Sequence, residues 1–206
     1  MSSFTIKIKI DYCYYIILLL YLNMLKIVTV PNVVLTIPSK LVDSFDGKLQ
    51  ELVKDMEHTL NTQVDPQGVG LAAPQVGVGL SLFIIKPSAK SKISVFVNPK
   101  ILEMEEKKSF TTRVKKDAKG KKEKHHLEGC LSIPRIWAAV KRTKKLLLAY
   151  QTFNGEKKTE WFTSFKAVII QHEIDHLNGI LFTQRALEQK NQLYEEKKGK
   201  LVKLEY

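Results

Sequence analysis

The sequence has few cysteines. Only Cys13 and Cys130 occur among its 206 residues, and they stand in unrelated contexts. This scarcity excludes a small secreted scaffold held together by several disulfides. Isolated thiols in a chain that also contains histidines point instead to a reducing compartment and to metal binding, since thiolate and imidazole are common metal ligands.

The sequence also lacks a hydrophobic run long enough to cross a membrane. The apolar stretch at residues 12–22, YCYYIILLLYL, is shorter than the roughly 20 residues that a membrane-spanning helix requires. A charged start followed by an apolar core resembles a signal peptide, yet no small-residue cleavage site follows it. We therefore interpret residues 1–23 as an apolar N-terminal extension, either preceding a true start at Met24 or packed on the domain. A membrane or export role is the alternative.

Positive charge exceeds negative charge, with 33 Lys and Arg against 21 Asp and Glu and a net charge of +12. Such an excess favours encounter with polyanions but does not specify a fold. Part of it lies at residues 113–124, which we interpret as a solvated hairpin tip or insertion loop, with a nucleic-acid patch as the alternative. The length predicts one catalytic domain at residues 24–185, followed by a basic C-terminal helix or tail at residues 186–206.

Two segments, one near the start of this domain and one directly after it, show helical character. Apolar residues recur at helical spacing over residues 44–64, where Ser44 or Asp46 could cap the helix. The Lys- and Glu-rich residues 186–203 are a further helical candidate.

A third helix is predicted at residues 165–177, with Ser164 as its cap and Gly179 at its end. Short strands are predicted at residues 80–85, 93–97, 101–106 and 146–153. The first two are followed by prolines, which are expected to end them. Helices that do not alternate regularly with strands favour an α+β fold. We expect mixed or antiparallel strands packed around a central helix, the one at residues 165–177.

The strongest local signal lies in that helix. Its sequence His172-Glu173-Ile174-Asp175-His176 matches the pattern HExxH. Four residues of an α-helix rotate by about 400°, so both imidazoles project from one face and can bind one ion. Glu173 follows the first ligand and can reach a water bound to that ion. The alternative is two histidines that form ordinary hydrogen bonds on a half-buried face.

A catalytic site needs a third protein ligand besides these two histidines. Cys130, in the segment EGCLS, is the candidate. Alone it would be interpreted as a small buried hydrophobic residue, but the HExxH pattern favours a ligand. His125 or His126 could supply a fourth ligand, and a closed site of four protein ligands would be structural.

A third segment, GVGLAAPQ at residues 68–75, carries little side-chain bulk. Backbone can therefore pass close to a ligand or to another strand. Gln75 presents an amide that could donate a hydrogen bond to a developing oxyanion. The alternative is a turn that serves only packing.

Together the three segments resemble the peptide deformylase family. GVGLAAPQ is similar to the family's first motif, EGCLS at 128–132 to the second and QHEIDH at 171–176 to the third, in the family's order and with similar spacing. The resemblance extends from about Met24 to about Gln184. It implies a cytoplasmic metal-dependent hydrolase of protein biosynthesis and N-terminal processing, which removes the formyl group from formyl-methionyl nascent peptides and releases formate.

The resemblance also implies a role for each motif residue. The metal would be held by Cys130, His172 and His176. Glu173 would act as the general base and then as the acid. The side chain of Gln75 and the backbone N–H of Leu131 would face the formyl oxygen.

Further positions follow from the same resemblance. The backbone of Gly70 would meet the substrate, and Glu128 and Gln171 would orient the metal ligands. The apolar residues that could line a methionine pocket are Val69, Ile133, Val168 and Ile169, with ordinary core packing as the alternative. The family implies Fe²⁺ as the native ion, although thiolate and imidazole also suit Zn²⁺, Ni²⁺ and Co²⁺.

Two other functions remain open at this point. A zinc endopeptidase would take a third His or Glu ligand downstream of HExxH, but the residues directly after His176 supply neither. A basic ribosome- or RNA-binding module would use its metal only for structure. Work at the ribosome is also compatible with the deformylase interpretation, since the basic C-terminal segment at residues 186–206 could dock there.

Overall fold

The computed structural model describes residues 24–64, 67–106, 108–110, 113–116, 122–125 and 127–205. The N-terminal extension predicted for residues 1–23 lies outside this part of the chain. No helix of the described residues has the length and hydrophobicity that crossing a bilayer requires.

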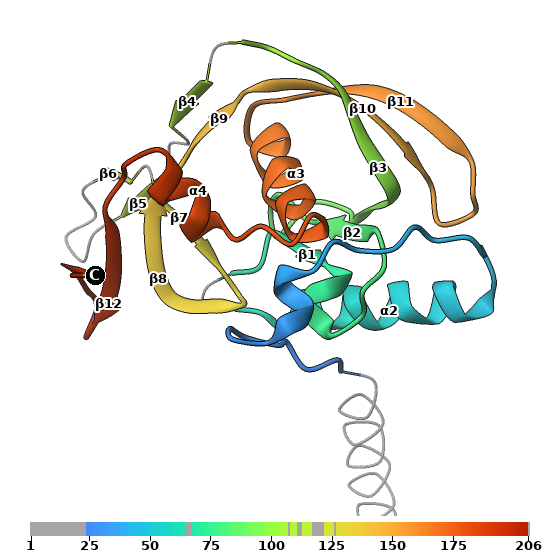
Figure 1. Cartoon of the computed structure of the whole chain (residues 1–206), viewed down its shortest axis with the longest axis horizontal. Helices are drawn as coiled ribbons and strands as arrows, with labels where there is room; N and C mark the ends of the chain where they lie inside the picture. Colours follow the sequence, from blue (N-terminus) through green and yellow to red (C-terminus); the bar gives the residue numbers. More distant parts are fainter. Residues whose placement is uncertain are drawn as a thin grey trace, which may run out of the picture.

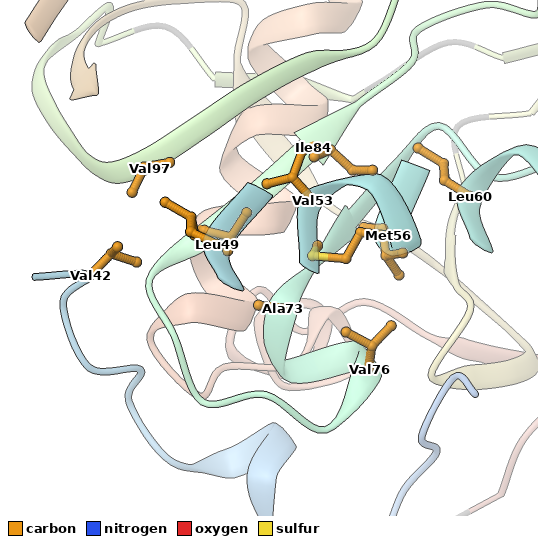
Figure 2. Packing of buried hydrophobic residues seen from close by; sticks show 11 residues of the cluster. Val42, Leu49, Val53, Met56, Leu60, Ala73, Val76, Ile84 and Val97 are labelled. Carbon is orange, nitrogen blue, oxygen red and sulfur yellow. The ribbon is translucent and has the colours of Figure 1, made fainter. Parts of the chain in front are cut away.

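Helix α2, Gly47–Thr62, confirms the first predicted helix. Of the two predicted caps, Asp46 serves: its carboxylate accepts hydrogen bonds from the N–H groups of Lys48 and Leu49 at 3.0 and 3.2 Å. One face of the helix packs on the first strands and the turn after them (Figure 2). The buried cluster formed there comprises Val42, Leu49, Val53, Met56, Leu60, Leu71, Ala73, Val76, Leu82, Ile84 and Val97.

The larger sheet has five antiparallel strands in the order β1-β2-β3-β10-β11. Their bounds are β1 Gly70–Ala72, β2 Leu82–Ile85, β3 Ser94–Met104, β10 Lys145–Gln151 and β11 Lys157–Thr163. The strands predicted within residues 80–85 and 146–153 are confirmed. Those predicted at 93–97 and 101–106 are one strand, β3.

The proline at position 99 does not end β3, because the strand changes register beside it. Asn98 has a φ of +50°, and the pairing of β3 with β10 shifts between Ala149 and Gln151. The Asn98 amide then accepts from the N–H of Val42 at 2.8 Å and donates to the Gln151 side chain at 2.9 Å. A bulge of this kind lets a strand pass a residue that cannot donate to the ladder.

Helix α3, Ser164–Leu177, carries the HExxH sequence and lies inside the curve of β3, β10 and β11 (Figure 1). This confirms the predicted fold class, α+β with antiparallel strands around a central helix. The predicted cap is wrong: Thr163 precedes the helix, and Ser164 is its first residue with a φ of +55°. Gly179 follows the helix as predicted, with a φ of +69° and the backbone of Thr36 where a Cβ would be.

A second sheet of four strands, in the order β13-β12-β8-β7, stands beside this helix. Its strands are β7 Leu127–Cys130, β8 Ile133–Ala139, β12 Leu193–Lys197 and β13 Lys200–Lys203. The helix predicted at residues 186–203 is therefore wrong. Helix α4, Phe182–Glu188, ends early, and β12 and β13 form a hairpin whose two-residue loop, Lys198 and Gly199, has positive φ at both positions.

Short elements complete the fold. They are the 3₁₀ turns η1 Val33–Thr36 and η2 Ala73–Val76 and the strands β4 Lys108–Phe110, β5 Arg113–Lys116, β6 Lys122–His125 and β9 Lys141–Thr143. β5 pairs with β6, so the described parts of the segment predicted as a hairpin tip or insertion loop form the two arms of a hairpin, while residues 117–121 lie outside the described part of the chain. β4 pairs with β9, whose buried Arg142 reaches the functional site.

Candidate metal centre and active site

Two segments that are distant in the sequence meet at one point. Cys130 ends β7, while His172 and His176 lie on one face of α3. One ligand atom from each residue lies within 4.8 Å of the other two, and the Cys130 sulfur lies 3.1 Å from His176 Nε2. The structure thus brings together the three residues that the sequence predicted as ligands, in an arrangement that could hold one metal ion. No fourth ligand joins them among the described residues, which exclude His126 and the side chain of His125.

A buried ion network orients one of the two imidazoles. Nδ1 of His172 lies 3.3 Å from a carboxylate oxygen of Glu128, which leaves Nε2 to face the thiol. Arg142 donates hydrogen bonds to the same carboxylate from Nε at 2.8 Å and Nη2 at 3.0 Å, and its Nη1 donates to Asp175 at 2.8 Å. The network therefore fixes the ring from behind, as in known metal sites.

The charges of this site suit a cation. Burial by itself would raise the pKa of the Cys130 thiol, but the charge of His176 and hydrogen bonds from both histidines lower that pKa well below 9.0. Burial would lower the pKa of His172, yet hydrogen bonds to Cys130 and Glu128 raise it to about 10. A thiolate beside imidazoles is a donor set for a borderline divalent ion.

Glu173 is positioned to handle a proton. Burial raises the pKa of its carboxyl to about 7, although the nearby His172 and His176 oppose the shift. Its Oε2 is buried without a hydrogen-bond partner in the described part of the chain, which is costly unless a ligand or water supplies one. A carboxyl with a pKa near neutrality can both accept and return a proton.

Gln75, at the end of the first motif, lies against the thiol. Its Nε2 donates to the sulfur of Cys130 at 3.4 Å and lies 3.3 Å from the Ser132 hydroxyl, while its Oε1 accepts from the N–H of Ala72 at 2.9 Å. The amide is therefore held in one orientation, with its donor side toward the site.

Position 70 requires glycine because the side chain of Glu173 lies close against its backbone. A Cβ at this position would overlap the carboxylate of Glu173. The first motif therefore passes directly over the HExxH helix, as its low side-chain bulk predicted.

A pocket of about 70 Å³ opens beside Cys130 and His172, which are part of its lining. Among its lining residues are the predicted Val69, Gly70, Gln75, Leu131, Val168, Ile169, His172 and Glu173. Ile133 does not line this pocket; it belongs to a separate buried cluster with Ala138, Val140 and Phe182.

Several residues of the site were missed in the sequence. Leu127, Trp137 and Phe165 also line the pocket, and Arg142 and Asp175 form the ion network. Arg142 stands in a run of basic residues, KRTKK, which gives no signal of burial. Asp175 lies within HExxH, at a position that the pattern leaves open.

The profile of the polypeptide deformylase family matches residues 24–192, most of the chain. The chain belongs to the peptide deformylase family. A peptide deformylase of Desulfotalea psychrophila is 39% identical over 177 residues, which cover 84% of this chain and 94% of that protein. A peptide deformylase of Borreliella burgdorferi is 35% identical over 180 residues, 87% of this chain and 93% of that protein.

Solved structures agree with this family. The crystal structure of peptide deformylase from Thermotoga maritima superposes with a TM-score of 0.66 at 32% identity, covering 79% of this chain and 97% of that one. A Met-Ala-Ser-bound class I type b peptide deformylase from Acinetobacter baumannii gives 0.65 at 30% identity, with 79% and 98% covered. As a peptide deformylase, the chain is a hydrolase of protein biosynthesis that removes the N-terminal formyl group from nascent peptides, which excludes the endopeptidase alternative.

Proposed function

We propose that Cys130, His172 and His176 hold the single divalent ion of this deformylase and that Glu173 moves the protons of the reaction. The grouping of the three ligand atoms within 4.8 Å of one another carries the proposal. Fe²⁺ is the ion that we propose for the cell, with Zn²⁺, Ni²⁺ or Co²⁺ able to replace it, because a thiolate and two imidazoles suit all four. When bound, the ion would supply Lewis-acid activation of a water molecule and of the formyl carbonyl.

Glu173 accepts the proton of the attacking water. Its carboxyl has a pKa of about 7, so near neutrality a substantial fraction is ionised and ready to act as the base. The protonated carboxyl then gives the proton to the departing amine nitrogen, which releases formate and a free N-terminus. Burial excludes bulk water from this carboxyl and so keeps the proton available for return.

Gln75 and Leu131 stabilise the charge that develops on the formyl oxygen. The Gln75 amide is held by Ala72 and already donates toward the site. The Leu131 N–H follows the proposed ligand Cys130 directly in the chain, and Leu131 lines the pocket. Two preorganised donors of this kind typically contribute about 10²–10³ each to the rate.

The formyl-methionyl peptide lies in the pocket beside the ligands. β1 is the outermost strand of its sheet, and Val69 and Gly70 line the pocket at its start, so the backbone there can meet an extended peptide. Val168 and Ile169 of α3 provide an apolar wall for the methionine side chain. Ile133 is not part of this proposal, because its side chain packs elsewhere.

Replacing Glu173 tests the proposed chemistry. Glu173→Ala should fold and bind one metal ion, yet lose formyl-Met-Ala-Ser hydrolysis by about 10²–10⁴. Metal content, thermal unfolding and formate release are measured on the same anaerobic sample. Glu160→Ala, on the exposed face of β11, is the matched control and should keep full activity. A metal-loaded Glu173→Ala enzyme with wild-type turnover rejects this role.

We also propose that the enzyme works in the cytoplasm and docks on the ribosome through its basic C-terminal segment. Lysines at positions 198, 200 and 203 are exposed on the β12–β13 hairpin. Deleting residues 186–206 would be a poor test, because Ala186 and Leu193 are buried in the core. Changing the three lysines to glutamine should weaken ribosome co-sedimentation and steepen its loss with salt, while peptide turnover stays unchanged. Unaltered co-sedimentation disposes of this partner.

A further inference from the structure

The C-terminal hairpin reaches the wall of the substrate pocket through one side chain. Trp137 of β8 lines that pocket together with Leu127 and Gly129. Its indole Nε1 donates a hydrogen bond of 2.8 Å to Oε2 of Glu196 on β12. The two strands are directly paired, with Tyr194 opposite Trp137 in the ladder.

The indole ring is also pressed against the strand that carries the thiol. A Cβ on Gly129 would lie 2.8 Å from the ring of Trp137. Gly129 directly precedes Cys130, so the ring packs on backbone next to the proposed ligand. Any movement of the ring therefore changes the wall of the pocket.

Trp137 lies between the substrate pocket and a second cavity. Gly129, Cys130 and Trp137 line the substrate pocket and also a second cavity of about 450 Å³. The lining of the second cavity also includes Glu196, together with Lys198 and Gly199 of the hairpin turn. The second cavity is large enough to receive an indole ring, so the ring of Trp137 has room to turn toward it.

We propose that Glu196 is a positioning residue that keeps Trp137 in the wall of the substrate pocket. The carboxylate fixes the direction of the indole N–H, and a hydrogen bond to an ionised acceptor is stronger than one between neutral groups. Without it the ring can turn toward the second cavity and widen the pocket. The effect falls on peptide binding, because Glu196 itself touches neither the metal ligands nor Glu173. This inference rests on the assignment of the first pocket to the peptide.

Tryptophan fluorescence measures the environment of the Trp137 ring independently of enzyme activity. The chain has two tryptophans, so Trp161→Phe, an exposed position on β11, leaves Trp137 as the single emitter. In that background Glu196→Ala should shift the emission to longer wavelength and increase quenching by acrylamide. The Michaelis constant for formyl-Met-Ala-Ser should rise by about tenfold, the scale of one lost hydrogen bond to a charged group, while kcat changes by less than about twofold.

Two further variants separate positioning from general damage. Glu196→Gln keeps an acceptor oxygen and should restore emission and KM most of the way to wild type. Glu195→Ala removes the neighbouring carboxylate, which forms an ion pair with Lys197, and should change neither the emission nor the KM. Wild-type emission and KM in Glu196→Ala overturn the proposal, as do equal changes in Glu195→Ala. Altered emission with an unchanged KM overturns the link to the substrate pocket. Absence of formyl-peptide hydrolysis in the unmodified enzyme would instead reject the proposed function and leave the fluorescence result standing.

Discussion

The residues of the proposed metal centre are recognisable in the sequence because their chemistry depends on residue type and spacing. His172 and His176 are four positions apart on a helix, which sets both rings on one face whatever the rest of the fold does. Cys130 is different, since only the tertiary structure brings it to that face. The EGCLS motif identified Cys130 as a candidate ligand, but no local pattern predicts that Arg142 and Asp175 are buried behind the site.

His172 should lose its proton when an ion binds. Before binding, hydrogen bonds to Cys130 and Glu128 hold its pKa at about 10, so at pH 7.5 the ring is protonated, while the thiol pKa is lowered. A metal ligand must be neutral imidazole, so binding should release about one proton per ion. Zinc titration of metal-free protein by calorimetry, in buffers with different ionisation enthalpies, counts the protons. A count near zero contradicts this protonation state, and a count near two would mean a protonated thiol.

The secondary-structure elements were predicted where hydrophobic periodicity dominates and missed where turn chemistry decides. Helix α2 and strands β2 and β10 follow from apolar spacing alone. The C-terminal hairpin was interpreted as a helix because lysine and glutamate are good helix formers. Its real signal is the pair Lys198-Gly199 between Leu193 and Leu201, since a residue followed by glycine suits a two-residue hairpin loop.

β7 and β8 were also missed, for a different reason. Both carry motif or variable residues, and their pattern is short and interrupted by the register shift between Glu128 and Cys130. Such a bulge breaks the alternation on which strand prediction depends. The irregular pairing falls between Glu128 and Cys130, which are both residues of the candidate site.

The ion network links β7 through Glu128, β9 through Arg142 and α3 through Asp175. Burial would raise the pKa of Glu128, but the charge of Arg142 and hydrogen bonds from His172 and Arg142 lower it from 4.5 to about 2. A lowered pKa in the folded state means stability that is present above pH 4.5 and lost as pH falls toward 2. The difference corresponds to about 3 kcal/mol.

Glu128→Gln should therefore remove this pH-dependent part of the stability. Denaturant unfolding of the metal-free proteins should give the wild type a larger free energy of unfolding than the variant, by a constant amount from pH 6 down to about 4.5. At lower pH the two free energies should converge. The raised pKa of His172 acts in the opposite sense, through a window from 6.5 upward to about 10, and does not overlap. If the difference in unfolding free energy between wild type and variant stays undiminished below pH 3, the lowered pKa of Glu128 is not its source.

At the scale of the whole molecule, the site depends on three separate parts of the core. Gln75 is flanked by Ala73 and Val76 of the cluster under α2. Cys130 belongs to the cluster of the smaller sheet, and Ile169 and Ile170 anchor α3 in the cluster of the larger sheet. No single segment can form the site alone, so correct ligand geometry reports that all three clusters have packed together.

A bound ion should accordingly stabilise the entire fold by linking the smaller sheet to α3. Binding to the native state alone contributes about 2.7 kcal/mol when free metal is a hundredfold above its dissociation constant. For a chain of 206 residues this corresponds to a rise of roughly 5–10 °C in Tm. Thermal unfolding with and without a chelator measures the difference.

The matched control for that experiment is Cys130→Ser, which removes the thiolate that the smaller sheet contributes. Its Tm should be lower than that of the metal-loaded wild type and nearly unaffected by chelator, because two imidazoles from one helix do not connect the two parts of the core. If chelator lowers the Tm of the variant as much as that of the wild type, the ion is bound elsewhere. If the stabilisation requires both Cys130 and the HExxH helix, the proposed metal centre links the smaller sheet to α3 in addition to serving the reaction.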